Sequence, residues 1–311
     1  MDEQRPDNQI IFGFPEEWAD FRKRHSLFLD RFSNIAEATR IAFERVMPES
    51  EPIERFVMLY GRLCVEDFHE IMLCCGNGYG FAALKLLRAL YEKAVTLEHL
   101  NNNPDELDAF LNHRYISEYK LFQAIADEFG TDALPENMRK ESAEKYEQFK
   151  KNYLVTDCKK CNTKRVNFTW SKLSFVAMAK RTRILGKLMG SAYYLPMRHT
   201  HSTGASLIER LEYNDEGFGF NPNAQRRQAD SAVREAYTII LEVIYIQLQR
   251  FKIEGLQGVF DKCCEDWTEI YVDDESSCAA MQNIRPSSLP SKRSLMIGAS
   301  ETPISINRSL Q

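Results

Sequence analysis

Apolar residues recur at helical spacing along most of this chain, in segments that proline and glycine separate. Phe56, Leu59 and Leu63 follow Pro52 near the 3.6-residue period, and proline fits the first position of a helix. Residues 79–100 are apolar around nearly the whole helical circumference, which is typical of a buried central helix. The predicted helices span residues 15–47, 52–76, 79–100, 103–129, 135–153, 170–188, 224–251 and 259–271. The sequence therefore predicts an all-α protein, an irregular multi-helix bundle.

The remaining segments are interpreted as connections and ends. No strong strand pattern and no internal repeat is evident, and residues 215–223 predict a loop. From residue 273 onward serine and proline accumulate and the apolar period ends, which indicates a flexible C-terminal tail. We therefore divide the chain into an N-terminal helical segment (1–52), a helical core domain (53–272) and a flexible tail (273–311).

The composition fits a folded protein that works in water. The chain has 311 residues, of which 44% are hydrophobic, enough to build a substantial core. Its formal charge of −5 gives no global reason to bind nucleic acid or an anionic membrane, so such a contact needs a local basic patch. No apolar run approaches the ~20 residues that span a bilayer, and residues 1–8 lack the apolar core of a signal peptide. We expect a cytoplasmic protein with no membrane association.

The cysteines are interpreted as thiols, since a chain of this length without a signal peptide seldom carries structural disulfides. Cys158 and Cys161 have the spacing of half a structural zinc site. No second Cys-x-x-Cys or histidine pair stands at a usual distance from them. The sequence predicts no cofactor and no metal, and leaves open whether these two cysteines bind zinc.

Arg88 and Glu92 stand one turn apart in the predicted central helix, on the stripe that also holds apolar residues. Opposite charges in such a stripe must be paired, because an isolated buried charge is costly. Arginine preceding glutamate is the weaker order for a pair four residues apart, so we expect further partners from elsewhere in the chain. The alternative is a structural ion pair that fixes how the helices pack.

Residues 193–203 gather groups that suit acid–base chemistry where Pro196 breaks a helix. Histidine is the natural general acid or base near neutral pH, and this segment holds His199 and His201. Two histidines two residues apart on a helix point in different directions, so we expect one of them to be structural. Arg88, Glu92, Tyr193 and His201 are the candidate catalytic residues, with His201 either a catalytic group or a hydrogen-bonding one.

Several short motifs together resemble a prokaryotic family of helical proteins of unknown function. The motifs are residues 88–92, the helix start at Asn103, the tyrosine-bearing stretch 113–119, the Trp170 segment and residues 193–201. They match an Arg-x-x-x-Glu helix, a Trp-led helix and a Tyr-x7-His segment over roughly residues 55–250. Met197 stands where this family usually has serine.

This family in turn is similar to the HEPN group of helical domains, many of which are RNA-cleaving toxins or parts of antiviral systems. Their chemistry uses an Arg-x4-6-His motif, with histidine as acid or base and arginine stabilising the charged phosphorus centre. Arg198 and His201 are too close in sequence to match that spacing. Arg62 and His69 have that spacing, but they lie in a predicted helix whose apolar period already accounts for their positions.

Two functions remain open, and the sequence does not decide whether the protein is an enzyme. The first is a non-catalytic helical module that senses or scaffolds a partner, as part of a prokaryotic antiviral defence system. The second is a HEPN-like ribonuclease or toxin acting on RNA, in which Arg88, Glu92 and His201 converge on a cleft and Tyr193 or Tyr115 assists. We expect a protein partner or a homo-oligomer, with RNA as a further candidate ligand.

Overall fold

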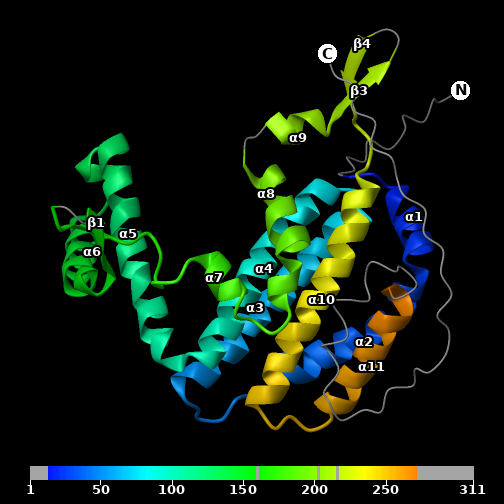
Figure 1. The fold of residues 1–311 in the computed structure, drawn as a ribbon, viewed down its shortest axis with the longest axis horizontal. Coiled ribbons are helices and arrows are strands. Elements are labelled where there is room, and N and C mark those ends of the chain that lie inside the picture. The colour runs from blue at the N-terminus through cyan, green and yellow to red at the C-terminus, as the bar shows by residue number, and fades with distance from the viewer. Residues whose placement is uncertain (1–12, 159–160, 202–203, 215–216, 272–311) are drawn as a thin grey trace, which may run out of the picture.

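The computed structural model describes residues 13–158, 161–201, 204–214 and 217–271 (Figure 1). The α-helices are α1 (Glu17–Arg24), α2 (Ser26–Phe43), α3 (Pro52–Gly76), α4 (Gly80–Asn102), α5 (Leu107–Phe129), α6 (Glu136–Phe149), α7 (Phe175–Ala179), α8 (Leu195–Thr200), α9 (Gly204–Ile208), α10 (Arg226–Arg250) and α11 (Leu256–Tyr271). Short 3₁₀ segments are η1 (Pro104–Glu106), η2 (Thr131–Ala133), η3 (Lys150–Tyr153) and η4 (Leu185–Leu188), and η5 (Met189–Tyr194) is a π-helix. The strands are β1 (Leu154–Cys158), β2 (Thr163–Val166), β3 (Leu211–Asn214) and β4 (Gly217–Phe220).

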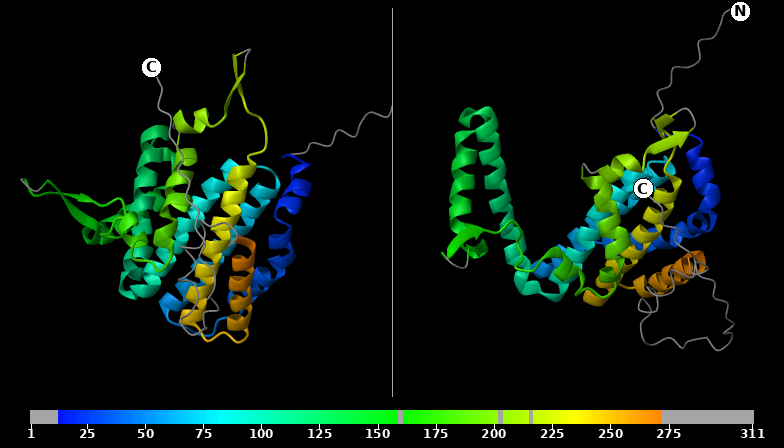
Figure 2. Two further views of the ribbon diagram at one scale, coloured as in Figure 1. Left: turned by 45° about the vertical axis from the view of Figure 1, so that its right-hand side comes forward. Right: turned by 45° about the horizontal axis from the view of Figure 1, so that its top comes forward.

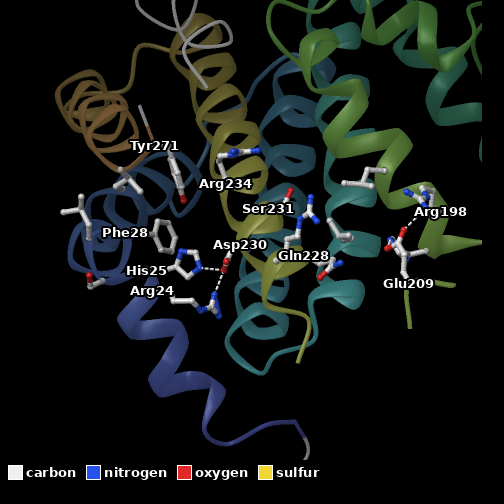
Figure 3. Close-up of a pocket in the computed structure, with 17 residues that line it drawn as sticks. Arg24, His25, Phe28, Arg198, Glu209, Gln228, Asp230, Ser231, Arg234 and Tyr271 are labelled. Carbon is white, nitrogen blue, oxygen red and sulfur yellow. Dashed lines mark hydrogen bonds and ion pairs between the residues drawn. The ribbon is translucent and has the colours of Figure 1, made fainter. Parts of the chain in front are cut away.

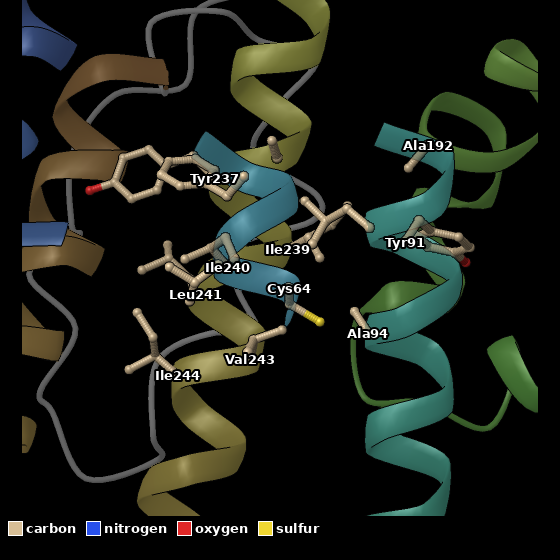
Figure 4. Packing of buried hydrophobic residues seen from close by; sticks show 14 of the residues in the cluster. Cys64, Tyr91, Ala94, Ala192, Tyr237, Ile239, Ile240, Leu241, Val243 and Ile244 are labelled. Atoms are coloured by element: carbon tan, nitrogen blue, oxygen red, sulfur yellow. The ribbon is translucent and has the colours of Figure 1, made fainter. Parts of the chain in front are cut away.

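The centre of the molecule is a bundle of α3, α4 and α10, which pack side by side (Figure 1). Cys64 of α3, Ala94 of α4 and Val243 of α10 meet in its core, all without exposed surface (Figure 4). The α3 helix begins as the sequence predicts, with Pro52 in its first turn and the Glu54 side chain accepting from the Glu51 backbone at 3.0 Å. The all-α multi-helix fold and the buried central helix are confirmed.

The N-terminal helices pack on the outside of this bundle together with α11 (Figure 1). Phe28 and Ile35 of α2 are almost completely buried within the same apolar cluster as α10 and α11. Arg226, at the start of α10, makes a bidentate ion pair with Glu17 of α1, with a shortest distance of 2.6 Å. The helices α1 and α2 are therefore tied to the bundle by both charged and apolar contacts.

A long helical hairpin, made of α5 and α6, projects from the bundle and carries the β1–β2 ribbon at its base (Figures 1 and 2). Its two helices meet through stacked aromatic rings. Tyr119 and Tyr146 lie 4.1 Å apart between ring centroids, and Tyr115 and Phe149 lie 5.1 Å apart. We call this hairpin the α5–α6 arm. Its base packs on the core through Leu107 and Phe110 of α5, and the rest projects from the bundle (Figure 1).

Two predicted helices are wrong in detail. The helix predicted over 15–47 is divided at His25, whose backbone is not helical and whose Nε2 lies 2.7 Å from Asp230 Oδ1. The helix predicted over 170–188 reduces to α7 and η4. Thr182 Oγ1 donates to the carbonyl of Ala179 at 2.6 Å and accepts from the backbone of Gly186 at 2.9 Å, so its side chain replaces helical hydrogen bonds.

Two short antiparallel ribbons are also present, in segments where the sequence has no strong strand pattern. The first pairs β1 with β2, and the second pairs β3 with β4 with Tyr213 opposite Phe218. Residues 217–220, predicted as part of a loop, therefore form a strand. Strands of four or five residues are too short to show clearly the alternation by which strands are identified in a sequence.

The predicted flexible tail, residues 273–311, lies outside the described residues. Within residues 13–271, apart from the three short gaps, no helix has the length and apolar character needed to cross a membrane.

Candidate functional site

Arg88 lies on α4 and contacts three side chains through different parts of its guanidinium group. Its Nε donates to Glu92 Oε1 at 2.8 Å, one helical turn away. Its central carbon lies 4.9 Å from the centre of the Tyr193 ring, within the range of a cation–π contact. Its Nη1 lies 3.1 Å from His201 Nε2. We expected Arg88 to have partners besides Glu92, and Tyr193 and His201 are these partners.

The π-helix η5 presents Tyr193 to this guanidinium. A proline ring clashes with the carbonyl one turn earlier in an α-helix, and the wider π-turn that precedes Pro196 avoids this clash. The Tyr193 ring is held by Phe175, at 4.8 Å between centroids, and by Tyr91, at 6.2 Å. Tyr91 is itself fixed, since its hydroxyl donates to the carbonyl of Leu185 at 2.8 Å. The aromatic support of Arg88 therefore rests on the core.

His201 and His199 have different surroundings, as their spacing predicts. His201 follows the last residue of α8 and is exposed, with its Nε2 facing Arg88. His199 is buried and lies against Phe81, with 4.3 Å between ring centroids. Burial lowers the pKa of His199 and outweighs the opposite effect of the Glu209 carboxylate. His199 is therefore the structural histidine of the two, and His201 is the accessible one.

The Arg88–Glu92 pair is less buried than its position in an apolar helix suggests. The Arg88 side chain keeps 17% of its surface exposed and the Glu92 side chain keeps 42%. The expectation of a buried ion pair is wrong for Glu92, because η5 and α8 cover this side of α4 only in part. The cluster of Arg88, Glu92, Tyr193 and His201 is thus open to solvent, which a reactive site requires.

Two other predicted groups do not join this cluster. Tyr115 lies on the α5–α6 arm, where it stacks on Phe149 and its hydroxyl accepts from Arg114 at 2.7 Å. Arg62 and His69 stay two turns apart along α3, with Arg62 Nε 3.6 Å from Glu66 Oε1. Burial and, secondly, the charge of Arg62 lower the pKa of His69. These residues share one face of α3 but form no compact site.

The cysteine motif spans the turn between β1 and β2. Cys161 Sγ lies 2.7 Å from Thr163 Oγ1, whereas the side chain of Cys158 is outside the described part of the structure. Over the described residues, no group of three or more histidine, cysteine or acidic side chains is arranged to hold a metal ion.

A cavity of about 1010 Å³ lies between α1, α2, α8, α10 and α11 (Figure 3). On one wall Asp230 Oδ1 lies 2.7 Å from His25 Nε2 and also accepts a hydrogen bond from Arg24. On the other wall Arg198 Nη2 lies 2.7 Å from Glu209 Oε1 (Figure 3). This cavity could not be predicted from the sequence, because the residues that line it are distant in sequence and share no motif.

Comparison with known proteins identifies a family. Residues 55–218, more than half of the chain, match a family of unknown function, DUF5677. This region contains Arg88, Glu92, Tyr193 and His201 but neither α1 and α2 nor α10 and α11. No curated protein and no solved structure matches the chain.

Proposed function

The chain belongs to DUF5677, a family of unknown function. We propose that this protein is a ribonuclease similar to HEPN domains. The site is the cluster of Arg88, Glu92, Tyr193 and His201. The observation that carries the proposal is the solvent-accessible contact of 3.1 Å between Arg88 Nη1 and His201 Nε2. It places an anion-binding group and an acid–base group side by side.

The contact also suits a role for His201 Nε2 as a proton acceptor. A guanidinium group has only N–H donors, so the imidazole nitrogen that faces it in a hydrogen bond is an acceptor. A general base needs such a lone pair. Glu92 holds Arg88 Nε and Tyr193 covers the guanidinium face, so both position the arginine for this contact.

RNA carries the groups that such a site can use. In the proposed reaction the Arg88 guanidinium moves from His201 Nε2 to the phosphate, which frees the single lone pair of Nε2. His201 Nε2 then takes the proton of a ribose 2′-hydroxyl, and the 2′-oxygen attacks the adjacent phosphorus. The bond to the 5′-oxygen breaks, and that oxygen leaves with a proton from water. Arg88 donates hydrogen bonds to the phosphoryl oxygens while their charge increases, which lowers the barrier. The products are a 2′,3′-cyclic phosphate and a 5′-hydroxyl end.

A cleavage assay on end-labelled single-stranded RNA tests this proposal. We expect the full chain to cut the RNA and His201→Ala to lower the rate about 100-fold or more, since that is the usual contribution of a general base. Arg88→Ala should cause a similar loss. Arg62→Ala and His69→Ala are matched controls on the exposed face of α3 and should retain the wild-type rate. Absence of cleavage by the wild type, or equal cleavage by all variants, would refute the proposal.

A non-catalytic sensing or scaffolding module is the second candidate function. It is favoured by the α5–α6 arm, which exposes Leu121 and Phe129 by 57% and 69% respectively. Large exposed apolar side chains on a projecting element suit a protein partner or a second copy of the chain. Under this function, Phe129→Glu would abolish self-association or partner binding, as measured by analytical ultracentrifugation, whereas His201→Ala would have no effect.

A cytoplasmic location and a role in prokaryotic antiviral defence are further parts of the proposal. The first is supported by the cysteine usage and the composition of the chain, and the second by its resemblance to HEPN domains. Neither part depends on the geometry of the cluster.

A further inference from the structure

The cavity between α1, α2, α8, α10 and α11 contains two buried polar atoms that lack hydrogen-bond partners among the described residues. They are Tyr271 Oη and His199 Nε2. His199 Nε2 lies 3.2 Å from Glu209 Oε2, but no hydrogen bond joins them. Leaving such atoms unsatisfied is costly, and natural proteins usually pair them. Both atoms have almost no accessible surface, so a bound molecule with polar groups would supply the missing partners after a small shift of the side chains that cover them.

The cavity lining is rich in N–H donors that suit an anion. Four arginines line it, namely Arg24, Arg198, Arg227 and Arg234. Arg24, Arg198 and Arg234 are each paired with a carboxylate but keep further N–H donors, whereas Arg227 has no ion pair among the described residues. Guanidinium groups pair with phosphate through parallel hydrogen bonds, which makes arginine a frequent phosphate ligand in proteins. Arg227 is exposed at the start of α10, and its side chain can reach a ligand without a change in the core.

Asp230 fixes one wall of the cavity. Burial alone would raise the pKa of Asp230, but the hydrogen bond with His25 and the charge of Arg24 outweigh burial, so the pKa of Asp230 is lowered. The carboxylate therefore stays ionised and holds the Arg24 and His25 side chains in place (Figure 3). His25 keeps only 10% of its side chain exposed, so this wall is built before a ligand arrives.

The rest of the lining mixes polar and apolar side chains, namely Ser26, Gln228 and Ser231 beside Leu27, Phe28, Leu84, Leu195 and Ile270. The volume of about 1010 Å³ lies at the upper end of the range of roughly 300–1,000 Å³ that is usual for small-molecule sites. A site of this size, with an arginine-rich part and an apolar part, suits a ligand that has a charged end and a flat apolar end.

We propose that this cavity binds a phosphorylated small molecule of mononucleotide size. Its phosphate pairs with the arginines, and its polar edge contacts Tyr271 Oη and His199 Nε2. The α1, α2, α10 and α11 walls lie outside residues 55–218, so the ligand site lies in large part outside the matched family region. The binding proposal does not rest on RNA cleavage, because none of its ligand contacts involves Arg88 or His201.

Calorimetric titration of the full-length protein tests the proposal. The probes are AMP, GMP, CMP and UMP, with adenosine and inorganic phosphate as partial ligands. We expect at least one mononucleotide to bind, and both partial ligands to bind about tenfold more weakly or not at all, because each lacks one half of the contacts. Binding of adenosine or of inorganic phosphate as tightly as the mononucleotides would contradict the proposed combination of charged and apolar walls.

Two variants locate the binding in this cavity. Tyr271→Phe removes only the unpartnered hydroxyl, and Arg227→Gln removes an exposed charge, so neither should disturb the fold. Each should weaken mononucleotide binding about tenfold, whereas Arg181→Gln, an exposed arginine outside the cavity, should bind like the wild type. If no mononucleotide binds, or if both cavity variants bind like the wild type, the proposal is wrong. Neither result depends on whether the protein cleaves RNA.

Discussion

Arg88 shows how one side chain can unite segments that are more than one hundred residues apart. Each of its contacts uses a different part of the guanidinium group: Nε for Glu92, the flat face for Tyr193 and Nη1 for His201. The need for such partners could be predicted from the sequence, since a charge in an apolar helix must be paired. The exposure of Glu92 could not, because it depends on how much of α4 the later segments cover.

A second residue, Glu98, makes the stability of the fold depend on pH. Its Oε1 accepts from the backbone of Arg183 at 2.5 Å, and its Oε2 has no hydrogen-bond partner among the described residues. Burial and, secondly, the negative charge of Glu242 raise the pKa of Glu98 from 4.5 to about 7. The folded state therefore holds the Glu98 proton at pH values at which the unfolded chain has already released it.

We predict that Glu98→Gln removes this pH dependence. Below pH 4.5 the carboxyl is protonated in both states and its stabilising contribution is fully present. As the pH rises from 4.5 to about 7, the wild type loses up to about 3 kcal/mol of unfolding free energy relative to the variant. Urea denaturation of both proteins at several pH values between 4.5 and 8 measures this difference. Parallel stability profiles would show that Glu98 titrates normally.

At the scale of secondary structure, strong local signals predicted the long helices and tertiary contacts decided the rest. Pro52 begins α3 as expected. The predicted helix 170–188 does not form, because the Thr182 hydroxyl binds backbone groups that a helix would use. The π-helix η5 follows from the position of Pro196, but nothing in the local sequence shows that Tyr193 on it would cover Arg88.

The start of α4 lies so close to α10 that it requires glycine at position 80. A Cβ atom there would lie 2.1 Å from the carbonyl oxygen of Gln225 and 2.8 Å from the backbone nitrogen of Ala229. Both are backbone atoms, so α4 or α10 would have to move. We predict that Gly80→Ala destabilises the protein by roughly 1–3 kcal/mol or more.

Gly258→Ala is the matched control for this prediction. A Cβ atom on Gly258, in the first turn of α11, would meet nothing within 4 Å, and alanine is the better helix former by up to about 1 kcal/mol. Thermal unfolding should therefore show a lower Tm for Gly80→Ala and an unchanged or higher Tm for Gly258→Ala. Equal Tm values for the two variants would mean that α4 and α10 are not in close contact at this point.

At the scale of the whole molecule, the helical class and the central position of α4 followed from the apolar pattern. The cavity could not be predicted, because its walls combine α1 and α2 with α8, α10 and α11, and no motif in the sequence relates these segments. The division into an N-terminal segment (1–52) and a core (53–272) remains a prediction. The burial of Phe28 and Ile35 in the common apolar cluster makes it testable.

We expect removal of residues 2–52 to prevent stable folding of the remainder. The deletion uncovers apolar side chains of α10 and α11, and it leaves Arg226 and Asp230 without their partners Glu17 and His25. Circular dichroism and size-exclusion chromatography of the truncated chain should show lost cooperativity and aggregation. A truncated chain that unfolds cooperatively with the Tm of the full protein would establish residues 1–52 as a separate segment.

If Arg88 and His201 act together on one phosphate group, their substitutions must not behave independently. The most direct measurement is the RNA-cleavage rate of the wild type, Arg88→Ala, His201→Ala and the double variant. Residues that work as a unit give grossly non-additive losses, so we predict that the double variant cleaves RNA no more slowly than the slower single variant. Losses that multiply in the double variant, or a wild type that leaves RNA intact, would contradict a shared catalytic site at Arg88 and His201.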